Sequence, residues 1–274
     1  MRSLHVRPGA RPGTGQPTPA ATALTPPRPV RAVARAAGEP DRAQASPSSP
    51  AQPTSVPALK QALLRAAAPT NRGKAADRAA RLTVLDAVVA LETAAPAKDA
   101  ALDAAGLSGE WGLLYSGPGD RAEAAAADTA AYEKRTGGLE GPVIAALRPL
   151  GRWVVSSTGT RQVIDAGAGS VHNVASFRLA GGLAGELDVE GAVAPAPPGE
   201  VTPAVGATCG RARTDVSFTA LTLRLGGRRL LSLPLTAFKP CGWIETTVLL
   251  DGGDLRVSRG DKGSVFVAAK RKDK

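Results

Sequence analysis

Few residues in the chain have the types and the spacing that catalysis or metal binding requires. Its 274 residues include two histidines, His5 and His172, and two cysteines, Cys209 and Cys241. These numbers exclude a His-rich metal site, a four-thiolate zinc site and a disulfide scaffold within one chain. A Ser-His-Asp mechanism would have to use His172, for which the sequence shows no clear carboxylate or nucleophile partner. Since no Gly-x-Ser-x-Gly elbow and no phosphate loop occur either, we predict no enzyme, no cofactor and no metal site.

The positive charge of the chain first suggests a nucleic-acid partner, but the distribution of the charge does not support one. The formal net charge is +10 and the isoelectric point is about 10.2. Residues 1–56 hold seven arginines and two acids, a charge of +5, and the tail 270–274 adds +3. The body between them, residues 57–269, is nearly neutral at +2. Nine aromatic residues are also few for a stacking platform on single-stranded nucleic acid, so we expect no nucleic-acid partner.

Residues 1–56 have the composition of a targeting segment. Residues 1–38 contain six arginines and no acid, together with alanines, threonines and prolines. An Arg-rich, hydroxyl-bearing and acid-free head is typical of organelle transit peptides. We therefore expect a disordered transit peptide and linker over 1–56, with a plain disordered arm as the alternative. The basic tail 270–274 is either a solubilising end or a small patch for anionic lipid headgroups.

The next segment, residues 57–106, has a helical pattern. Residues 58–65 are rich in Ala and Leu and follow Pro57, which suits a first helical turn. A second helix is predicted over residues 75–93, where Asp77 suits the positive end of the helix dipole. The apolar residues expected to form its buried stripe are Leu82, Leu85 and Val89.

From residue 107 onward the apolar residues recur with a period of two, which predicts β-strands. An Ala- and acid-rich loop is expected at 120–133. Within residues 214–225 the alternation changes phase near Ala220, which implies a bulge or break there. The expected strands are 110–116, 161–165, 171–179, 183–193, 214–225, 230–235, 243–250, 255–259 and 264–269.

Short connections between these strands favour antiparallel pairing. Asp-Gly-Gly-Asp at 251–254 and Gly-Asp-Lys-Gly at 260–263 are strong turn signals. We therefore predict a mainly β fold, a lipocalin-like antiparallel up-and-down barrel over residues 107–269 preceded by two short helices. An eight-stranded barrel of this kind has room for one small ligand.

The first predicted strand opens with Gly109-Glu110-Trp111, the Gly-x-Trp arrangement of lipocalins, and places Trp111 and Tyr115 on one face. In such barrels an Arg near the last strand lies over the Trp ring and closes the end of the barrel. Both Arg256 and Arg259 are placed for this role. Because they are three residues apart, a regular strand points them to opposite sides, so at most one of them caps Trp111.

Three blocks of the sequence are informative when they are taken together. The first spans residues 59–92 and includes Asn-Arg-Gly at 71–73 and Leu-Glu at its end. The second is Gly-Glu-Trp-Gly-Leu-Leu-Tyr-Ser at 109–116, which is followed by Gln-Val-Ile-Asp and Val-His-Asn-Val segments. The third and most distinctive is Asp-Leu-Arg-Val-Ser-Arg-Gly-Asp-Lys-Gly-Ser-Val-Phe-Val at 254–267. In these blocks the chain resembles the plastid lipid-associated proteins, also called plastid fibrillins.

The resemblance implies a non-enzymatic protein of plastoglobules or thylakoids, or of the plastid stroma. It implies binding of isoprenoids such as carotenoids and quinones, or of acyl lipids, and peripheral contact with a plastid membrane or plastoglobule surface. The first alternative is an adaptor that docks on an isoprenoid-synthesising enzyme, and the second is an enzyme acting on a lipid in the barrel. In a reducing stroma the two cysteines are expected to be free thiols, with a regulatory disulfide as the other possibility.

Candidate site residues follow from the pattern and the resemblance together. Arg256, Asp254 and Lys262 are expected to form ion pairs at the rim of the barrel. The candidate ligand-binding residues are Trp111, Tyr115, Phe177, Phe218, Trp243, Arg256 and Arg259. The residues of the expected family-signature turn are Asp254, Gly260, Asp261, Lys262 and Gly263.

Overall fold

The computed structural model of the chain describes residues 55–97, 104–136, 154–196, 213–237, 240–250 and 252–271. Residues 1–54 and the end of the basic tail, 272–274, lie outside the described residues. The helices are α1 (Val56–Ala67), α2 (Arg78–Ala94), α3 (Ala104–Leu107), α4 (Arg121–Ala125) and α5 (Ala130–Thr136), and a 3₁₀ turn, η1 (Ala68–Thr70), follows α1. The strands are β1 (Gly109–Pro118), β2 (Val154–Asp165), β3 (Ser170–Leu179), β4 (Ala184–Pro195), β5 (Arg213–Leu225), β6 (Arg228–Pro234), β7 (Cys241–Leu249), β8 (Leu255–Gly260) and β9 (Ser264–Lys270).

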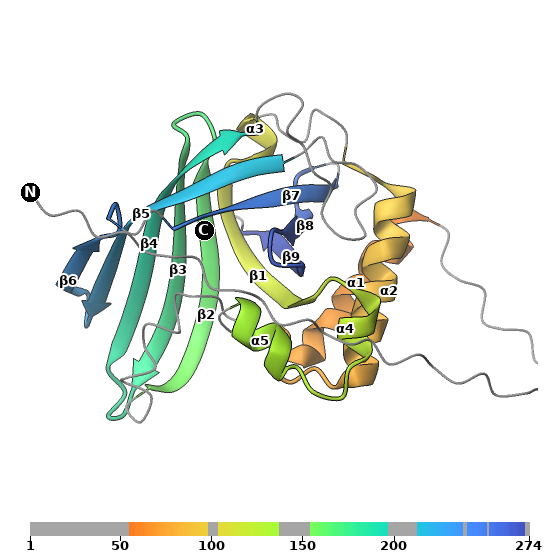
Figure 1. The fold of residues 1–274 in the computed structure, drawn as a ribbon, viewed down its shortest axis with the longest axis horizontal. Coiled ribbons are helices and arrows are strands. Elements are labelled where there is room, and N and C mark those ends of the chain that lie inside the picture. The colour runs from red at the N-terminus through yellow and green to blue at the C-terminus, as the bar shows by residue number, and fades with distance from the viewer. Residues whose placement is uncertain are drawn as a thin grey trace, which may run out of the picture. The chain divides into compact units, whose positions relative to one another are not determined.

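All nine strands belong to one sheet, and every pairing between them is antiparallel. The order is β4-β3-β2-β1-β9-β8-β7-β5-β6, and β4 pairs in addition with β5. The second half of β5 also carries β6, which pairs with no other described strand. The predicted mainly β, antiparallel architecture is thus confirmed, and Figure 1 shows the strong curvature of the strands.

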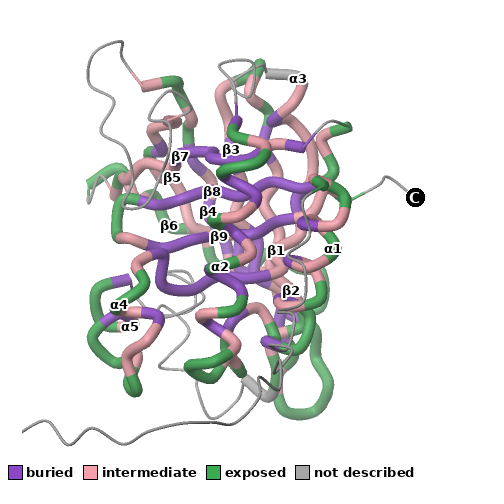
Figure 2. The backbone as a smooth tube through the Cα atoms, turned by 90° about the vertical axis from the view of Figure 1, so that its right-hand side faces the viewer, coloured by how far each residue is buried: buried purple, intermediate pink, exposed green. Residues whose placement is uncertain are grey.

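Helices α1 and α2 cover one face of this sheet (Figure 1). Their apolar side chains pack against β1, β7, β8 and β9 in the main hydrophobic core. From the strands this core takes Tyr115, Val248 and alternate residues of the last hairpin, Leu255, Val257, Val265 and Val267. In Figure 2, β8 and β9 appear as buried stretches behind α2. The residues between them in the sequence, such as Arg256, Ser258, Phe266 and Ala268, point to the opposite face.

The predicted irregularity in the fifth strand is confirmed. Glu190 of β4 pairs with Ala220, but the next residue, Gly191, pairs with Phe218. Thr219 is therefore the extra residue of a β-bulge, and the bulge lets the apolar alternation change phase without a change of face.

A second bulge lies in β1, and here the prediction was wrong. The pairing with β9 shifts between Leu113 and Tyr115, so Leu114 is the extra residue. As a result Trp111 packs with Ile164 and Ala268 on one face of the sheet, whereas Tyr115 joins the core under the helices on the other. The two aromatic residues do not share a face.

Helix α2 also differs from its predicted orientation. The buried face is built from Val84, Leu85, Val88 and Leu91 together with two charged residues, Arg81 and Glu92. Val89, which was expected in the buried stripe, is 45% exposed. The predicted role of Asp77 is confirmed, since its carboxylate accepts a hydrogen bond from the backbone N–H of Ala80 at 2.8 Å and caps the helix.

The segment expected as a loop at 120–133 contains two short helices, α4 and most of α5. Asp120 caps α4, since its side chain accepts hydrogen bonds from the backbone N–H groups of Ala122 and Glu123. The guanidinium of Arg81 on α2 donates hydrogen bonds to the carbonyls of Ala124 and Ala126, which fixes α4 against α2. Long-range bonds of this kind decide the conformation of an Ala-rich stretch whose local pattern is ambiguous.

Candidate functional site: a cavity on the inner face of the sheet

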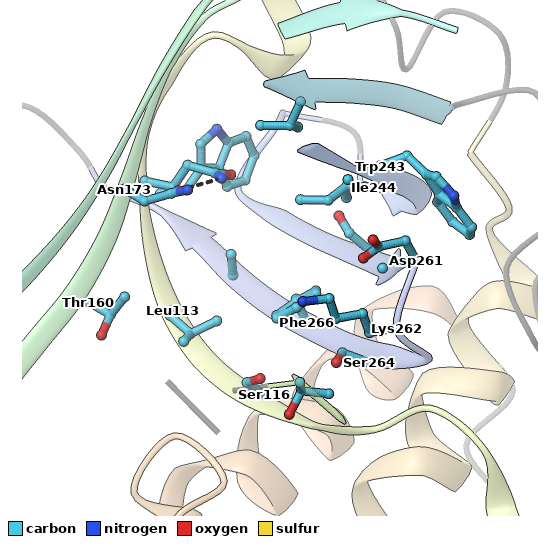
Figure 3. Close-up of a pocket in the computed structure, with 18 of the residues that line it drawn as sticks. Leu113, Ser116, Thr160, Asn173, Trp243, Ile244, Asp261, Lys262, Ser264 and Phe266 are labelled. Atoms are coloured by element: carbon cyan, nitrogen blue, oxygen red, sulfur yellow. Dashed lines mark hydrogen bonds between the residues drawn. The ribbon is translucent and has the colours of Figure 1, made fainter. Parts of the chain in front are cut away.

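The face of the sheet opposite the helices lines a cavity of about 260 Å³. Its walls come from β1, β2, β3, β5, β7, β8 and β9, and α5 contributes Tyr132 and Thr136. Figure 3 shows Thr160 and Asn173 on one side of this space, with Trp243, Ile244 and Asp261 on the other. Much of the wall is apolar and includes Leu113, Val216, Phe218, Phe266 and Ala268.

One end of the cavity is built around Trp111 and Arg256. The guanidinium carbon of Arg256 lies 4.8 Å from the centre of the Trp111 ring, which is a cation–π contact. The indole N–H donates to the carbonyl of Leu107 at 2.8 Å, and Lys270 lies 5.5 Å from the same ring. Of the two arginines placed by the sequence to cap Trp111, the structure selects Arg256.

Arg256 also begins a chain of polar side chains across the cavity. Its Nη2 donates to Oε1 of Gln162, whose Nε2 in turn donates to Oδ1 of Asn173 at 2.8 Å. Arg256 is only 8% exposed, and burial lowers the pKa of its guanidinium to about 10. No carboxylate among the described residues forms an ion pair with it.

Two hydroxyl groups in the same wall have no hydrogen-bond partner within the described part of the chain. They are Oγ of Ser258, two residues after Arg256 on β8, and Oγ1 of Thr160, two residues before Gln162 on β2. Unpaired buried polar groups are rare in folded proteins because they lose their hydrogen bonds to water. No local sequence pattern marks these hydroxyls, Gln162 or Asn173 as site residues, although the alternation along β8 places Ser258 on the same face as Arg256.

The other end of the cavity reaches solvent. Asp261 and Lys262, in the turn between β8 and β9, line the cavity and are exposed, as is Cys241 at the start of β7. Trp243 borders this end, where Arg213 lies 5.2 Å from its ring. Phe218 contributes to the wall beside them. The candidate residues Trp111, Phe218, Trp243 and Arg256 are therefore brought together around one cavity.

Arg259, in contrast, points away from the cavity. Its Nε and Nη2 donate to the two carboxylate oxygens of Glu92 on α2, each at 2.7 Å, and its Nη1 donates to the carbonyl of Gly119 at 3.0 Å. The two side chains are 2% and 0% exposed, so this is a buried bidentate ion pair. Arg259 was expected among the ligand-binding residues, but its side chain lies outside the cavity wall and joins α2 to the sheet.

Tyr115 and Phe177 also lie outside the cavity wall. The β1 bulge directs Tyr115 into the core under α1 and α2, where burial raises the pKa of its hydroxyl. Phe177 packs with Leu187 and the leucines of β5 in a separate cluster. Phe177 thus lies in a second apolar region, between β3, β4 and β5, and not beside Trp111.

The residues of the signature turn have divided roles. The ion pairs expected among Arg256, Asp254 and Lys262 do not form, because Asp254 pairs with Lys60 of α1 and Arg256 faces the cavity. Gly260, Asp261 and Lys262 line the open end of the cavity. Gly263 has a φ of 75° and its N–H donates to the carbonyl of Gly260 at 3.0 Å, so it serves the turn as predicted.

His172 has the carboxylate partner that the sequence did not reveal. Its Nδ1 lies 3.3 Å from Oδ1 of Asp188, and the side chain of Glu190 lies nearby, with ligand atoms of the three groups within 4.8 Å of one another. Asp188 is also paired with Arg224 at 3.2 Å. Cys241 is a free thiol, and its partner in the suggested disulfide, Cys209, lies outside the described residues.

Among the helices that the structure describes, none is long and apolar enough to cross a membrane. The fold and the site define a mainly β protein whose antiparallel sheet carries helices on one face and an apolar cavity on the other. The PAP_fibrillin family model matches residues 57–202, slightly more than half of the chain. The chain therefore belongs to the PAP_fibrillin family, the plastid lipid-associated proteins.

The matched region covers the first two sequence blocks and ends before the third. No curated protein and no solved structure shows a significant match to the chain. Membership of the family indicates a plastid protein associated with lipids.

Proposed function

We propose that the chain is a non-enzymatic lipid-associated protein that holds an isoprenoid, such as a carotenoid or quinone, or an acyl lipid in the cavity. The observation that carries this proposal is the cavity of about 260 Å³, whose wall includes Leu113, Phe218, Phe266 and Ala268. Sites for small ligands are concave and mostly apolar, with a few polar groups that fix orientation. The combination of this wall with Arg256 and Gln162 at one end fits that description.

The sheet around the cavity is proposed to be a lipocalin-like barrel. Starting from β5, the strand pairings run through β4, β3, β2, β1, β9, β8 and β7 and return to β5. The Arg256 guanidinium over the Trp111 ring supports the same proposal, since a capped Trp in the first strand is the arrangement expected for that fold. Strand β6 departs from the pattern, because it extends β5 beyond this ring of pairings.

The proposed place of action is a plastoglobule or thylakoid surface, or the stroma, reached through a transit peptide in residues 1–56. The Arg-rich, acid-free head supports this proposal. A fluorescent reporter fused to residues 1–56 is expected to enter plastids. Retention of the reporter in the cytosol would contradict the transit function.

A second role, docking on an isoprenoid-synthesising enzyme, is favoured by the apolar surface of β6. Leu230, Leu231 and Leu233 are 59%, 43% and 45% exposed. Neighbouring apolar side chains on a surface often mark a site of interaction with another protein or a membrane.

The test is to purify the full chain, extract it with organic solvent and quantify the released lipid by mass spectrometry. About one lipid per chain is expected for an occupied single cavity. Ala268→Trp fills the space beside Trp111 and Arg256 and should release far less lipid, whereas Val89→Trp, on the exposed side of α2, is the matched control and should retain it. Melting curves check that both variants fold. Empty wild-type protein that purifies with a stable enzyme partner would favour the adaptor, and turnover of the lipid would contradict a non-enzymatic role.

A further inference from the structure

The closed end of the cavity contains a buried cation, Arg256, that has no counter-charge among the residues the structure describes. Arg256 is 8% exposed and lines the cavity, and its one hydrogen bond within the described residues goes to Oε1 of Gln162. A guanidinium carries five N–H donors. A buried charge is costly unless an opposite charge and hydrogen bonds compensate it. Arg259, three residues along the strand, has both from Glu92.

The layer of the sheet around Arg256 forms one wall of the cavity. Arg256 pairs with Ala268 of β9, which pairs in turn with Leu113 of β1, while Trp111 pairs with Gln162 of β2. Because β8 and β2 are separated by β9 and β1 in the sheet, the hydrogen bond from Arg256 to Gln162 crosses the inside of the sheet. The smallest side chain of this layer, Ala268, lies between them.

Two further polar groups line the same cavity. The hydroxyls of Ser258 and Thr160 have no partner among the described residues, and each is two residues from a member of the Arg256–Gln162 pair, on the same face of its strand. The carboxylate that lines the cavity, Asp261, is five residues from Arg256, about 16 Å along an extended strand, and lies in the exposed turn at the open end. It does not neutralise the closed end.

The wall between the two ends is mainly apolar, although the hydroxyl-bearing residues Ser116, Tyr132, Thr136 and Ser264 also line the cavity. Leu113, Phe218, Ile244 and Phe266 line this part of the cavity. A ligand that satisfies the whole cavity therefore has an acidic group at one end and a hydrocarbon chain along the rest of its length.

We propose that the cavity binds a lipid acid, with its carboxylate on Arg256 at the closed end and its hydrocarbon chain directed toward Asp261 and Lys262 at the open end. This inference rests on the proposed function and narrows it from apolar lipids in general to ionised amphiphiles. The carboxylate accepts hydrogen bonds from the guanidinium and from the hydroxyls of Ser258 and Thr160. The Trp111 ring supports the opposite face of the guanidinium.

The test compares palmitic acid with methyl palmitate, which has the same chain and no charge. Binding of each to the full chain is measured at pH 8 by isothermal titration calorimetry. Palmitate is expected to bind the wild-type protein about 10- to 100-fold more tightly than the ester, the range expected for a charge-assisted hydrogen bond. Arg256→Gln should remove this preference and leave the affinity for the ester nearly unchanged.

Lys262→Gln is the matched control, because it removes a cation from the open end of the same cavity. It should keep the preference for the acid, and Ser258→Ala should reduce the preference without abolishing it. Melting temperatures identify any variant that fails to fold. Equal affinity of the wild-type protein for acid and ester, or equal loss of both in Arg256→Gln, would overturn this inference while leaving the proposed function intact. If neither compound binds and no lipid is extracted from the purified protein, the proposed function itself fails.

Discussion

Arg256 and Arg259 lie three residues apart on β8 and have opposite environments. Arg259 points to the face covered by helices and forms a buried bidentate ion pair with Glu92. Arg256 points to the cavity, where it contacts the Trp111 ring and the Gln162 amide and has no acidic partner within the described residues. Arg259 thus has a counter-charge within the protein, and for Arg256 the proposed lipid acid would supply one. One strand therefore contributes to the core with one face and to the wall of a cavity with the other.

The largest expected effect on stability comes from breaking the buried ion pair between Arg259 and Glu92. Arg259→Met leaves the carboxylate of Glu92 buried and unpaired, which is expected to lower the free energy of unfolding by about 3–5 kcal/mol. Urea denaturation followed by circular dichroism measures this loss. The double variant Glu92→Met with Arg259→Met is the control and should recover part of the stability, because the carboxylate of Glu92 is then removed together with its partner, while the buried Glu245 opposite Arg259 remains. A loss below about 1 kcal/mol in the single variant would show that the pair is not essential to the fold.

The second-largest expected effect is a loss of folding stability at high pH, and it depends on the two tyrosines of the chain. Burial raises the pKa of the hydroxyls of Tyr115 and Tyr132, so both groups favour the folded state while they are protonated. Above about pH 10 the unfolded chain loses these protons first, and stability should fall by up to about 1.4 kcal/mol per pH unit for each tyrosine. The lowered pKa of Arg256 acts in the opposite direction from about pH 10 upward, so the fall should be steeper in Arg256→Met.

Urea denaturation at several pH values between 9 and 11 measures this fall, and absorbance at 295 nm reports tyrosinate. Tyr132→Phe leaves Tyr115 as the one tyrosine of the chain, which isolates the group under the helices. Ionisation of that residue near pH 10 in folded protein would contradict its burial on the helix-covered face.

A smaller effect on stability is expected when Arg256, at the closed end of the cavity, is replaced. Arg256→Met removes the contact with Trp111 and a hydrogen bond to Gln162, but it also removes a buried charge for which the described part of the chain holds no counter-charge. These contributions oppose each other, so we expect a loss of about 1 kcal/mol or less in the lipid-free protein. Urea denaturation of delipidated samples tests this value. A loss as large as that of Arg259→Met would remove the distinction between the two arginines.

The smallest effect is expected for an ion pair at the surface. Lys60 of α1 pairs with Asp254 at the start of the same hairpin, and their side chains are 25% and 48% exposed. Lys60→Met is expected to cost less than about 1 kcal/mol, and the difference should shrink as salt is added. Thermal melting at low and high salt measures both. A cost that does not change with salt would indicate that packing of the Lys60 side chain, and not its charge, stabilises the contact.

The strands and most turns could be predicted from the sequence because their signal is local. The phase change at Ala220 marks the β5 bulge, and the alternation along 255–259 separates Arg256 from Arg259. Strand β2 extends further back than predicted, since residues 156–160 are polar or small and show no apolar alternation. Short-range patterns thus predict the fold class and the opposite directions of Arg256 and Arg259. Of the two arginines, Arg256 lines the cavity as expected.

The errors have a long-range origin. Glu92 and Arg81 are charged, and charged side chains are rarely buried unless they are paired. Here partners far along the chain, Arg259 and the carbonyls of Ala124 and Ala126, compensate their burial. The bulge at Leu114 directs Tyr115 to the face of the sheet that the helices cover, and no local residue type indicates this bulge. The polar groups Gln162, Ser258 and Thr160 were missed for a related reason, since only the assembled sheet brings them around Arg256.

Strand β6 has a further consequence for the protein in a crowded compartment. Within the described residues one of its edges pairs with β5 and the other is free, and three of its leucines are exposed. A free strand edge can recruit the edge of another chain and so start aggregation. Here Arg228 and Arg229 give the strand two like charges and Pro234 removes a backbone donor. These features oppose pairing between two β6 edges while three leucines of the strand stay exposed.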